Sequence, residues 1–255
     1  MNRLMPLKIA ALLFVSNAVA DAAKAVELKA LFPAAMKNAL TELVPQFEKS
    51  SGHKVTIDYG TVGAIVDRLK KGEAADLAVV TDVRLADLTK QDKIMADGQA
   101  VIAVVGIGVF VRKGEAKPDI GSVDAFKKAL LSAKSIVYGD PALGDSSGIY
   151  VSGLIERLGI AAEMKPKAKL VAAGSKVDTV AKGDAEIGFD QMSNVIVDAR
   201  VESVGSLPSA IQNYTKYAGG VVAGSKQHEA VKTLIVFLTS SASQSVMKQK
   251  GFEGF

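Results

Sequence analysis

The chain has 255 residues, of which 49% are hydrophobic and 7 are proline, so it can bury one large core or two ordinary ones and is not disordered. Its formal net charge is +4, but the lysines are scattered and no basic stripe carries interleaved aromatic residues, which argues against a nucleic-acid partner. Cysteine is absent, which excludes disulfides, thiolate metal sites and a cysteine nucleophile.

The N-terminus has the pattern of a secretory signal peptide. Two cations precede a short apolar run, residues 9–15, and Ala18 and Ala20 follow it in an A-x-A pattern. A transmembrane helix needs about 20 apolar residues, and this run is shorter. We therefore expect residues 1–20 to be a signal peptide, with the mature protein in the periplasm and not stably inserted in the membrane.

Strands and helices alternate along the rest of the chain. Apolar runs and period-two alternation predict the strands, and most are followed by apolar residues at helical spacing. This order predicts an α/β fold with mainly parallel sheets flanked by helices. The expected strands are residues 28–32, 55–59, 77–80, 101–111, 136–138, 169–172, 186–189 and 217–223.

The chain is expected to cross twice between two lobes. The apolar run 101–111 is long and contains two glycines, as in a strand that passes from one domain to another. Residues near Pro208 look like the return connection. We therefore expect lobe 1 to consist of residues 24–104 and 208–255, and lobe 2 of residues 105–207. Within lobe 1, Pro45 is expected to kink or restart a helix, because proline has no N–H to donate.

Three loops between a strand and a helix carry glycine and hydroxyl residues. They contain Gly60 and Thr61, then residues 140–150 with Ser146 and Ser147, and then Ser175 after a further glycine. The first turn of a helix has unpaired N–H groups and a partial positive charge, which suits an anion. Ligands of such sheets bind beyond the carboxyl ends of the strands, so the loops are expected to face each other across a cleft.

Four stretches in this order resemble the periplasmic solute-binding proteins of ABC transporters, in the branch of the molybdate-binding proteins. They are FPAAMKNALTEL, FEKSSGHKVTIDYGTVGAIVDRLKKGEAADLAVVTD, YGDPALGDSSGIYVSGLIERLGI and KGDAEIGFDQMSN. A divergent subgroup with the same fold includes proteins similar to aconitate isomerase. The resemblance covers nearly all of the mature chain and implies the two-lobed type II clamp fold.

The resemblance also implies where a ligand would bind. Molybdate binders of this branch use hydroxyl groups at positions that match Ala35, Val62 and Gln191 here, so none of these three positions keeps its hydroxyl. The replacements favour a small organic acid with two or three carboxylates, which Arg84 and Lys176 could neutralise. The expected binding residues are Ala35, Met36, Thr61, Val62, Thr81, Arg84, Ser146, Ser147, Ser175, Lys176 and Gln191.

Three functions remain open from the sequence. The protein either captures a small anion for an ABC-transporter permease, or isomerises a small tricarboxylate by proton transfer without a cofactor, or presents its cleft to a membrane receptor. Asp145, Asp190 and Lys176 are candidate acids and bases by position, but no catalytic residue is assigned. His53 and His228 lack companions at metal-ligand spacing, so no metal or cofactor is expected. The protein is expected to be a monomer.

Overall fold

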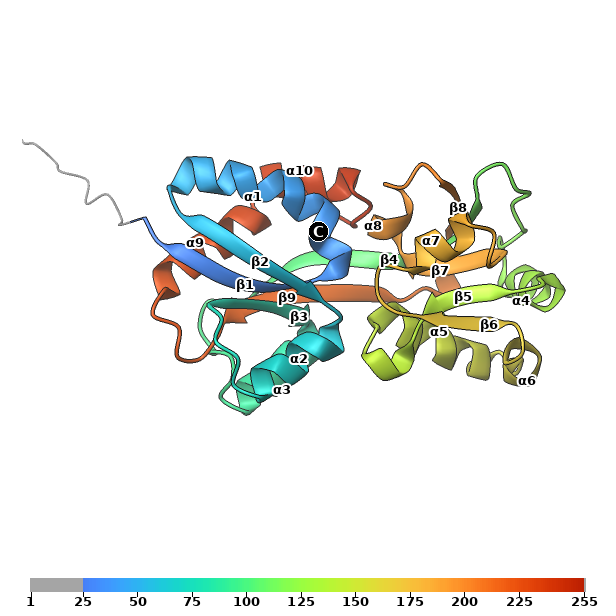
Figure 1. Cartoon of the computed structure of the whole chain (residues 1–255), viewed down its shortest axis with the longest axis horizontal. Coiled ribbons are helices and arrows are strands. Elements are labelled where there is room, and N and C mark those ends of the chain that lie inside the picture. Colours follow the sequence, from blue (N-terminus) through green and yellow to red (C-terminus); the bar gives the residue numbers. More distant parts are fainter. Residues whose placement is uncertain (1–24, 255) are drawn as a thin grey trace, which may run out of the picture.

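The computed structural model describes residues 25–254 as two lobes that lie side by side (Figure 1). The predicted signal peptide lies outside the described residues. Within residues 25–254, no helix combines the length and apolar character that a membrane span requires.

Among residues 25–254, a single nine-stranded sheet extends through both lobes in the order β2-β1-β3-β9-β4-β7-β5-β6, and β8 pairs with β4. Parallel pairs join β1 to β2 and β3, and β5 to β6 and β7, whereas all pairs of β4 and β9 are antiparallel. The strands are β1 (Glu27–Pro33), β2 (Lys54–Gly60), β3 (Leu77–Thr81), β4 (Ala100–Arg112), β5 (Ile136–Gly139), β6 (Ala168–Val171), β7 (Ile187–Gln191), β8 (Val201–Ser206) and β9 (Tyr214–Val221).

Strand β4 changes partner in its middle and thereby joins the lobes. Gly106 is the last β4 residue paired with β9, and Ile107 is the first paired with β7. The Gln212 side chain fixes this point, because its Oε1 accepts from the Ile107 N–H and its Nε2 donates to the Ile107 carbonyl, both at 3.0 Å. The point at which β4 changes partner therefore lies within the apolar run 101–111.

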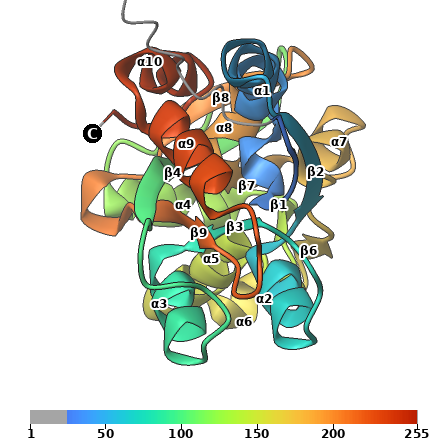
Figure 2. The same cartoon turned by 90° about the vertical axis from the view of Figure 1, so that its left-hand side faces the viewer.

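Helices cover both faces of the sheet in each lobe (Figures 1 and 2). In lobe 1, α1, α9 and α10 lie on one face and α2 and α3 on the other, while in lobe 2 α7 and α8 lie opposite α5 and α6. The helices are α1 (Lys37–Ser51), α2 (Val62–Lys70), α3 (Asp82–Lys90), α4 (Val123–Ser132), α5 (Ser146–Arg157), α6 (Ala161–Met164), α7 (Lys176–Ala181), α8 (Met192–Val195), α9 (His228–Thr239) and α10 (Ser241–Gln249).

Each lobe has its own hydrophobic core. The lobe 1 core combines residues between 28 and 105 with residues between 217 and 252, so both ends of the described chain build it. Two clusters with members between 107 and 207 fill lobe 2. Residues 77–80 of β3 are fully buried, as a strand covered on both faces requires. The lobe boundaries predicted at residues 105 and 208 stay a prediction at single-residue precision.

Two local features differ from expectation. Helix α1 continues through Pro45 without a break, because Pro45 lies on the exposed side, where water can hydrate the carbonyl that loses its partner. Strand β8 was not predicted. Its sequence VESVGS includes Gly205 at φ 140°, next to the point where the register with β4 shifts. Such a bulge weakens the period-two pattern by which a strand is recognised.

Candidate functional site

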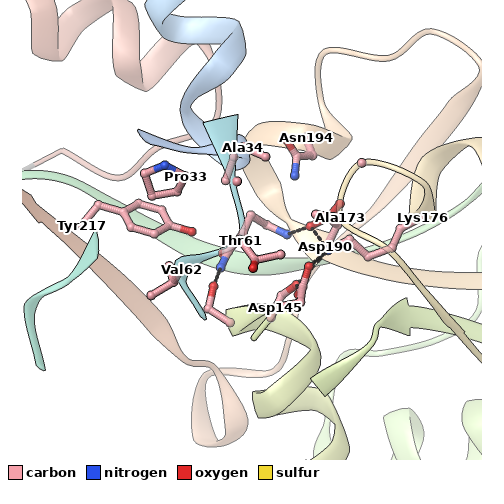
Figure 3. A pocket seen from close by; sticks show the side chains of 16 residues that line it. Pro33, Ala34, Thr61, Val62, Asp145, Ala173, Lys176, Asp190, Asn194 and Tyr217 are labelled. Atoms are coloured by element: carbon pink, nitrogen blue, oxygen red, sulfur yellow. Dashed lines mark hydrogen bonds and ion pairs between the residues drawn. The ribbon is translucent and has the colours of Figure 1, made fainter. Parts of the chain in front are cut away.

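A cavity lies between the lobes, at the ends of strands from both of them (Figure 3). It encloses about 340 Å³ of empty space, part of it open to solvent. Lobe 1 contributes Pro33, Ala34, Ala35, Gly60, Thr61, Val62 and Tyr217, and lobe 2 contributes Asp145, Ser146, Ser147, Ala173, Gly174, Lys176, Asp190, Gln191 and Asn194.

The three predicted loops meet at this cavity. The Thr61 hydroxyl caps α2 by accepting from the Ala64 N–H at 3.0 Å, and the Asp145 carboxylate caps α5 by accepting from the Gly148 N–H at 2.8 Å. The N–H groups of Val62, Ser146 and Ser147 have no hydrogen-bond partner among residues 25–254. Two helix N-termini with free amides thus line one cavity, which provides donors and partial positive charge for an anion.

Close packing of α5 on the end of β5 positions the second loop. A Cβ atom added at Gly148 would lie 1.8 Å from the Gly139 carbonyl oxygen, and one added at Gly139 would lie 2.2 Å from the Asp145 carboxylate. Only glycine at both positions allows the helix to start this close to the strand. The first-turn amides of α5 are therefore held at the cavity by backbone contact.

A buried cluster of three ionisable side chains lies on the lobe 2 side of the cavity (Figure 3). Lys176 Nζ is 2.7 Å from Asp145 Oδ2 and 2.9 Å from Asp190 Oδ1, and it also donates to Ser147 Oγ at 3.2 Å. The side chains of Lys176, Asp145 and Asp190 are only 3%, 8% and 2% exposed. The three N–H groups of the ammonium are thus all used inside the protein, and none remains for a ligand.

The cluster shifts the pKa of each member. Burial tends to lower the pKa of Lys176, but Asp190 and Asp145 raise it to about 12. Burial tends to raise the pKa of Asp145, but Lys176 and hydrogen bonds from Ser147 and Gly148 hold it below its usual value. Burial also raises the pKa of Asp190, and there the effect of Lys176 does not compensate. The two carboxyl groups therefore differ in their tendency to carry a proton.

Gln191 and Tyr217 close the inner wall. Gln191 Nε2 donates to Thr215 Oγ1 at 3.1 Å and to Ser146 Oγ at 3.3 Å, while its Oε1 is buried without a partner among the described residues. Burial raises the pKa of Tyr217 to about 12, so its phenol stays neutral at physiological pH. A buried amide atom without a partner costs about 1–3 kcal/mol, which a polar ligand or water at this position would recover.

The two lobes touch directly beside the cavity, in what we call the closing contact, formed by Thr61 and Gly63 of lobe 1 and Leu143 and Gly144 of lobe 2. Thr61 Oγ1 donates to the Leu143 carbonyl at 2.7 Å, and the Gly63 N–H donates to the Gly144 carbonyl at 3.3 Å. A Cβ atom added at Gly63 would lie 2.7 Å from the Cα of Gly144. The structure is therefore a closed form, in which backbone meets backbone across the cleft.

Comparison with known proteins identifies the family. Residues 28–253 match the family described as bacterial extracellular solute-binding protein. The chain belongs to this family. Its fold is similar to that of the periplasmic molybdate-binding protein of Azotobacter vinelandii, with a TM-score of 0.75 and 17% identity over 89% of this chain and 98% of that chain. The predicted two-lobed α/β clamp is thereby confirmed.

Two curated relatives span nearly the whole solute-binding protein. An aconitate isomerase of a Pseudomonas species is 30% identical over 257 residues, which covers 98% of this chain and 97% of the relative. A molybdate-binding protein of Azotobacter vinelandii is 25% identical over 244 residues, which covers 92% of each chain. Both similarities agree with the resemblance that the sequence motifs indicated.

Seven of the eleven expected binding residues of this solute-binding protein line the cavity. Those that line the cavity are Ala35, Thr61, Val62, Ser146, Ser147, Lys176 and Gln191. Met36 is fully buried in the lobe 1 core, and Ser175 lies just before α7, next to Gly174 and Lys176, which line the cavity. Thr81 and Arg84 line a neighbouring outer pocket together with Tyr214 and Lys216. Arg84 is 56% exposed in its side chain, and its nearest carboxylate is that of Asp87, at 3.6 Å.

Some lining residues were not among the expected binding residues. Tyr217 lies in a strand that was recognised only by its apolar character, and its neighbours gave no sign that the phenol faces a cleft. Asp145 and Asp190 were considered as acids or bases, but not as partners of Lys176. Their polar character at strand ends was the available signal, while the pairing across 31 residues between Asp145 and Lys176 depends on how α5 and α7 pack.

Proposed function

We propose that the solute-binding protein captures a small organic acid with two or three carboxylates in the inter-lobe cavity. The free amides of Val62, Ser146 and Ser147 at two helix N-termini carry this proposal, because they supply donors for a carboxylate where Lys176 has none left. The relatives named above agree with an anionic ligand in general.

The rest of the lining favours an organic acid over a tetrahedral oxyanion. An oxyanion accepts hydrogen bonds at every face, but Pro33, Ala34, Ala35 and Val62 offer apolar side-chain surface. Gln191 supplies an amide that can donate or accept. Carbon atoms of a di- or tricarboxylate would contact the apolar wall while its carboxylates reach the amides.

A second candidate function is the isomerisation of a small tricarboxylate. It is supported by the 30% identity with an aconitate isomerase over nearly the full chain, and by the buried acid groups at the cavity. The reaction removes a proton from one carbon and adds one to another while the double bond moves between them, so it needs only an acid and a base within reach. Asp190 is the ionisable group at the cavity whose position suits one of these roles, because the N–H groups of Lys176 are directed to Asp145, Asp190 and Ser147.

We also propose export and a membrane partner. The family is one of extracellular solute-binding proteins, and the N-terminal pattern supports a periplasmic location after removal of residues 1–20. A closed clamp loaded with solute is the form that would dock on an ABC-transporter permease. Mass spectrometry of the secreted protein tests the cleavage, since a mature N-terminus elsewhere would contradict it.

A thermal-shift screen tests the binding proposal. The purified protein is heated with molybdate, sulfate, succinate, citrate, tricarballylate or trans-aconitate, because a ligand at a hundred times its dissociation constant stabilises by about 2.7 kcal/mol. We expect a shift with the carboxylic acids and none with the two oxyanions. Ala34→Glu places a carboxylate in the cavity and should abolish the shift, whereas Ala116→Glu at an exposed position should keep it. A shift with molybdate alone would refute the organic-acid proposal.

Incubation with trans-aconitate tests the second candidate. Proton NMR follows the ratio of the cis and trans isomers over time, without any added cofactor. A ratio that moves to equilibrium only with protein present supports isomerase activity. A constant ratio at high protein concentration, with a clear thermal shift for the same acid, leaves capture as the function.

A further inference from the structure

The buried cluster carries one positive and two negative charges. Lys176 is the only cation among the residues that line the cavity, and its three N–H groups go to Asp145, Asp190 and Ser147. With both carboxylates ionised, the wall of the cavity has a net charge of −1. A carboxylate ligand that enters the cavity then meets an uncompensated negative charge, which is costly where water is largely excluded.

The two carboxylates differ in how well their oxygens are satisfied. Asp145 Oδ1 accepts from Ser147 Oγ at 2.6 Å and from the Gly148 N–H at 2.8 Å, and its Oδ2 accepts from Lys176. Asp190 Oδ1 lies 2.9 Å from Lys176 Nζ and accepts from the Gln191 N–H at 2.7 Å, but Asp190 Oδ2 has no hydrogen-bond partner within residues 25–254. Asp190 Oδ2 is therefore the carboxylate oxygen of this cluster to which the described residues donate no hydrogen bond.

We propose that ligand capture is coupled to the uptake of one proton by Asp190, whose new O–H group then donates a hydrogen bond to the bound carboxylate. One O–H bond forms on Oδ2, the proton comes from the solvent buffer, and no other bond changes. Protonation removes the net charge of the wall and converts an acceptor into a donor. This inference rests on the proposed capture of an organic acid.

Among the titratable groups at the cavity, Asp190 is the one whose surroundings allow it to exchange a proton. The charged or titratable groups that face it are Lys176 from α7, Asp145 before α5 and Tyr217 from β9. Lys176 and Tyr217 both have a pKa of about 12, so they keep their protons at neutral pH. The hydrogen bonds that Asp145 receives favour its ionised form. At Asp190, burial raises the pKa and thereby favours the neutral form of the carboxyl group.

Calorimetry measures proton uptake directly. Tricarballylate, which is saturated and cannot be isomerised, is titrated at pH 8 into the protein in PIPES and in Tris, two buffers with different ionisation enthalpies. At this pH the acid is fully ionised, so any buffer dependence of the heat reports on the protein. We expect uptake of about one proton per bound acid, and an affinity that falls on the order of tenfold per pH unit as the pH rises.

Two variants identify the group. Asp190→Asn mimics the neutral acid, leaves a balanced Lys176–Asp145 pair, and should bind without proton uptake and without pH dependence. Asp178→Asn removes a carboxylate from an exposed ion pair with Arg200 and should behave as the wild type. Binding of tricarballylate by the wild type without a buffer dependence would overturn this inference while leaving capture intact. If no acid of the screen binds, the proposed function itself fails.

Discussion

At the scale of single residues, the site contains a lysine whose N–H groups are all directed to other residues of the protein. In the proposed function, the ligand is therefore bound by backbone amides. Lys176 was expected to neutralise a bound carboxylate, but its ammonium is enclosed by Asp145, Asp190 and Ser147. A buried charge of this kind is tolerated only with complete pairing. The cluster therefore fixes the positions of the α5 and α7 starts, and in the proposed function the free amides hold the anion.

Removal of the lysine charge tests this role. Lys176→Met leaves two buried carboxylates together, so we expect a loss of about 3–5 kcal/mol in the free energy of unfolding at pH 7. The loss should be smaller at pH 5, because protonation of one carboxyl group removes the repulsion. Urea denaturation measures both values. Lys232→Met, at an exposed pair with Asp97, should cost much less, because solvent screens such a pair, and an equal cost at both positions would contradict the account.

From the pKa shifts of Asp145 and Asp190, we predict opposite pH dependences of their contributions to the free energy of unfolding. The folded pKa of Asp145 lies below its usual value of 3.8, so its contribution is present above that pH and is lost as pH falls through the folded pKa. The pKa of Asp190 is raised, so its contribution is present below 3.8 and is lost as pH rises through the raised pKa. Urea denaturation between pH 4 and 8 should therefore show a smaller decline toward high pH for Asp190→Asn than for the wild type. Parallel curves would refute this assignment.

At the scale of elements, the helix starts were predictable and their packing was not. Thr61 before α2 and Asp145 before α5 mark the helix starts, because each side chain accepts a hydrogen bond from a first-turn amide. The close approach of α5 to β5, which requires Gly139 and Gly148, follows only from the three-dimensional arrangement. The same holds for the antiparallel pairing of β9 with β3 and β4, since it joins segments far apart in the chain.

A pair of glycine substitutions in α5 tests the importance of this approach. Gly148→Ala forces α5 away from the Gly139 carbonyl, so it should cost about 1–3 kcal/mol in unfolding free energy and weaken acid binding. Gly153→Ala in the same helix meets only the flexible end of Arg157, at 3.3 Å, and should stabilise by about 0.5–1 kcal/mol. Equal effects on acid binding, measured by calorimetry, would show that the position of α5 is not critical.

At the scale of the whole molecule, two lobes with separate cores meet at β4, at β9 and at the closing contact. The alternation of strands and helices could be predicted from the sequence, because apolar runs and glycines mark it, whereas the two crossings near residues 105 and 208 stay a prediction. It could not be predicted from the sequence that Thr81 and Arg84 line a separate outer pocket. Val62 of lobe 1 and Ser146 of lobe 2 line both this pocket and the inner cavity, so they form the boundary between the two. The distance of Arg84 from the cavity is therefore a property of the assembled lobes.

Substitution at the closing contact tests whether closure and binding are linked. Gly63→Ala places a methyl group against Gly144 without entering either core, so the free energy of unfolding should change by less than about 0.5 kcal/mol. The lobes should nevertheless be held apart, with a larger radius of gyration in X-ray scattering and weaker acid binding. Gly254→Ala, which meets nothing within 4 Å, should leave both quantities unchanged. An unaltered affinity in Gly63→Ala would separate binding from closure.

A crystal structure with the carboxylic acid that gives the largest thermal shift tests the central claim most directly. We predict a carboxylate in the inter-lobe cavity with its oxygens about 2.7–3.2 Å from the amide nitrogens of Val62, Ser146 or Ser147. An acid bound instead in the outer pocket beside Arg84 and Lys216, with the amides of the inner cavity free, would contradict the account.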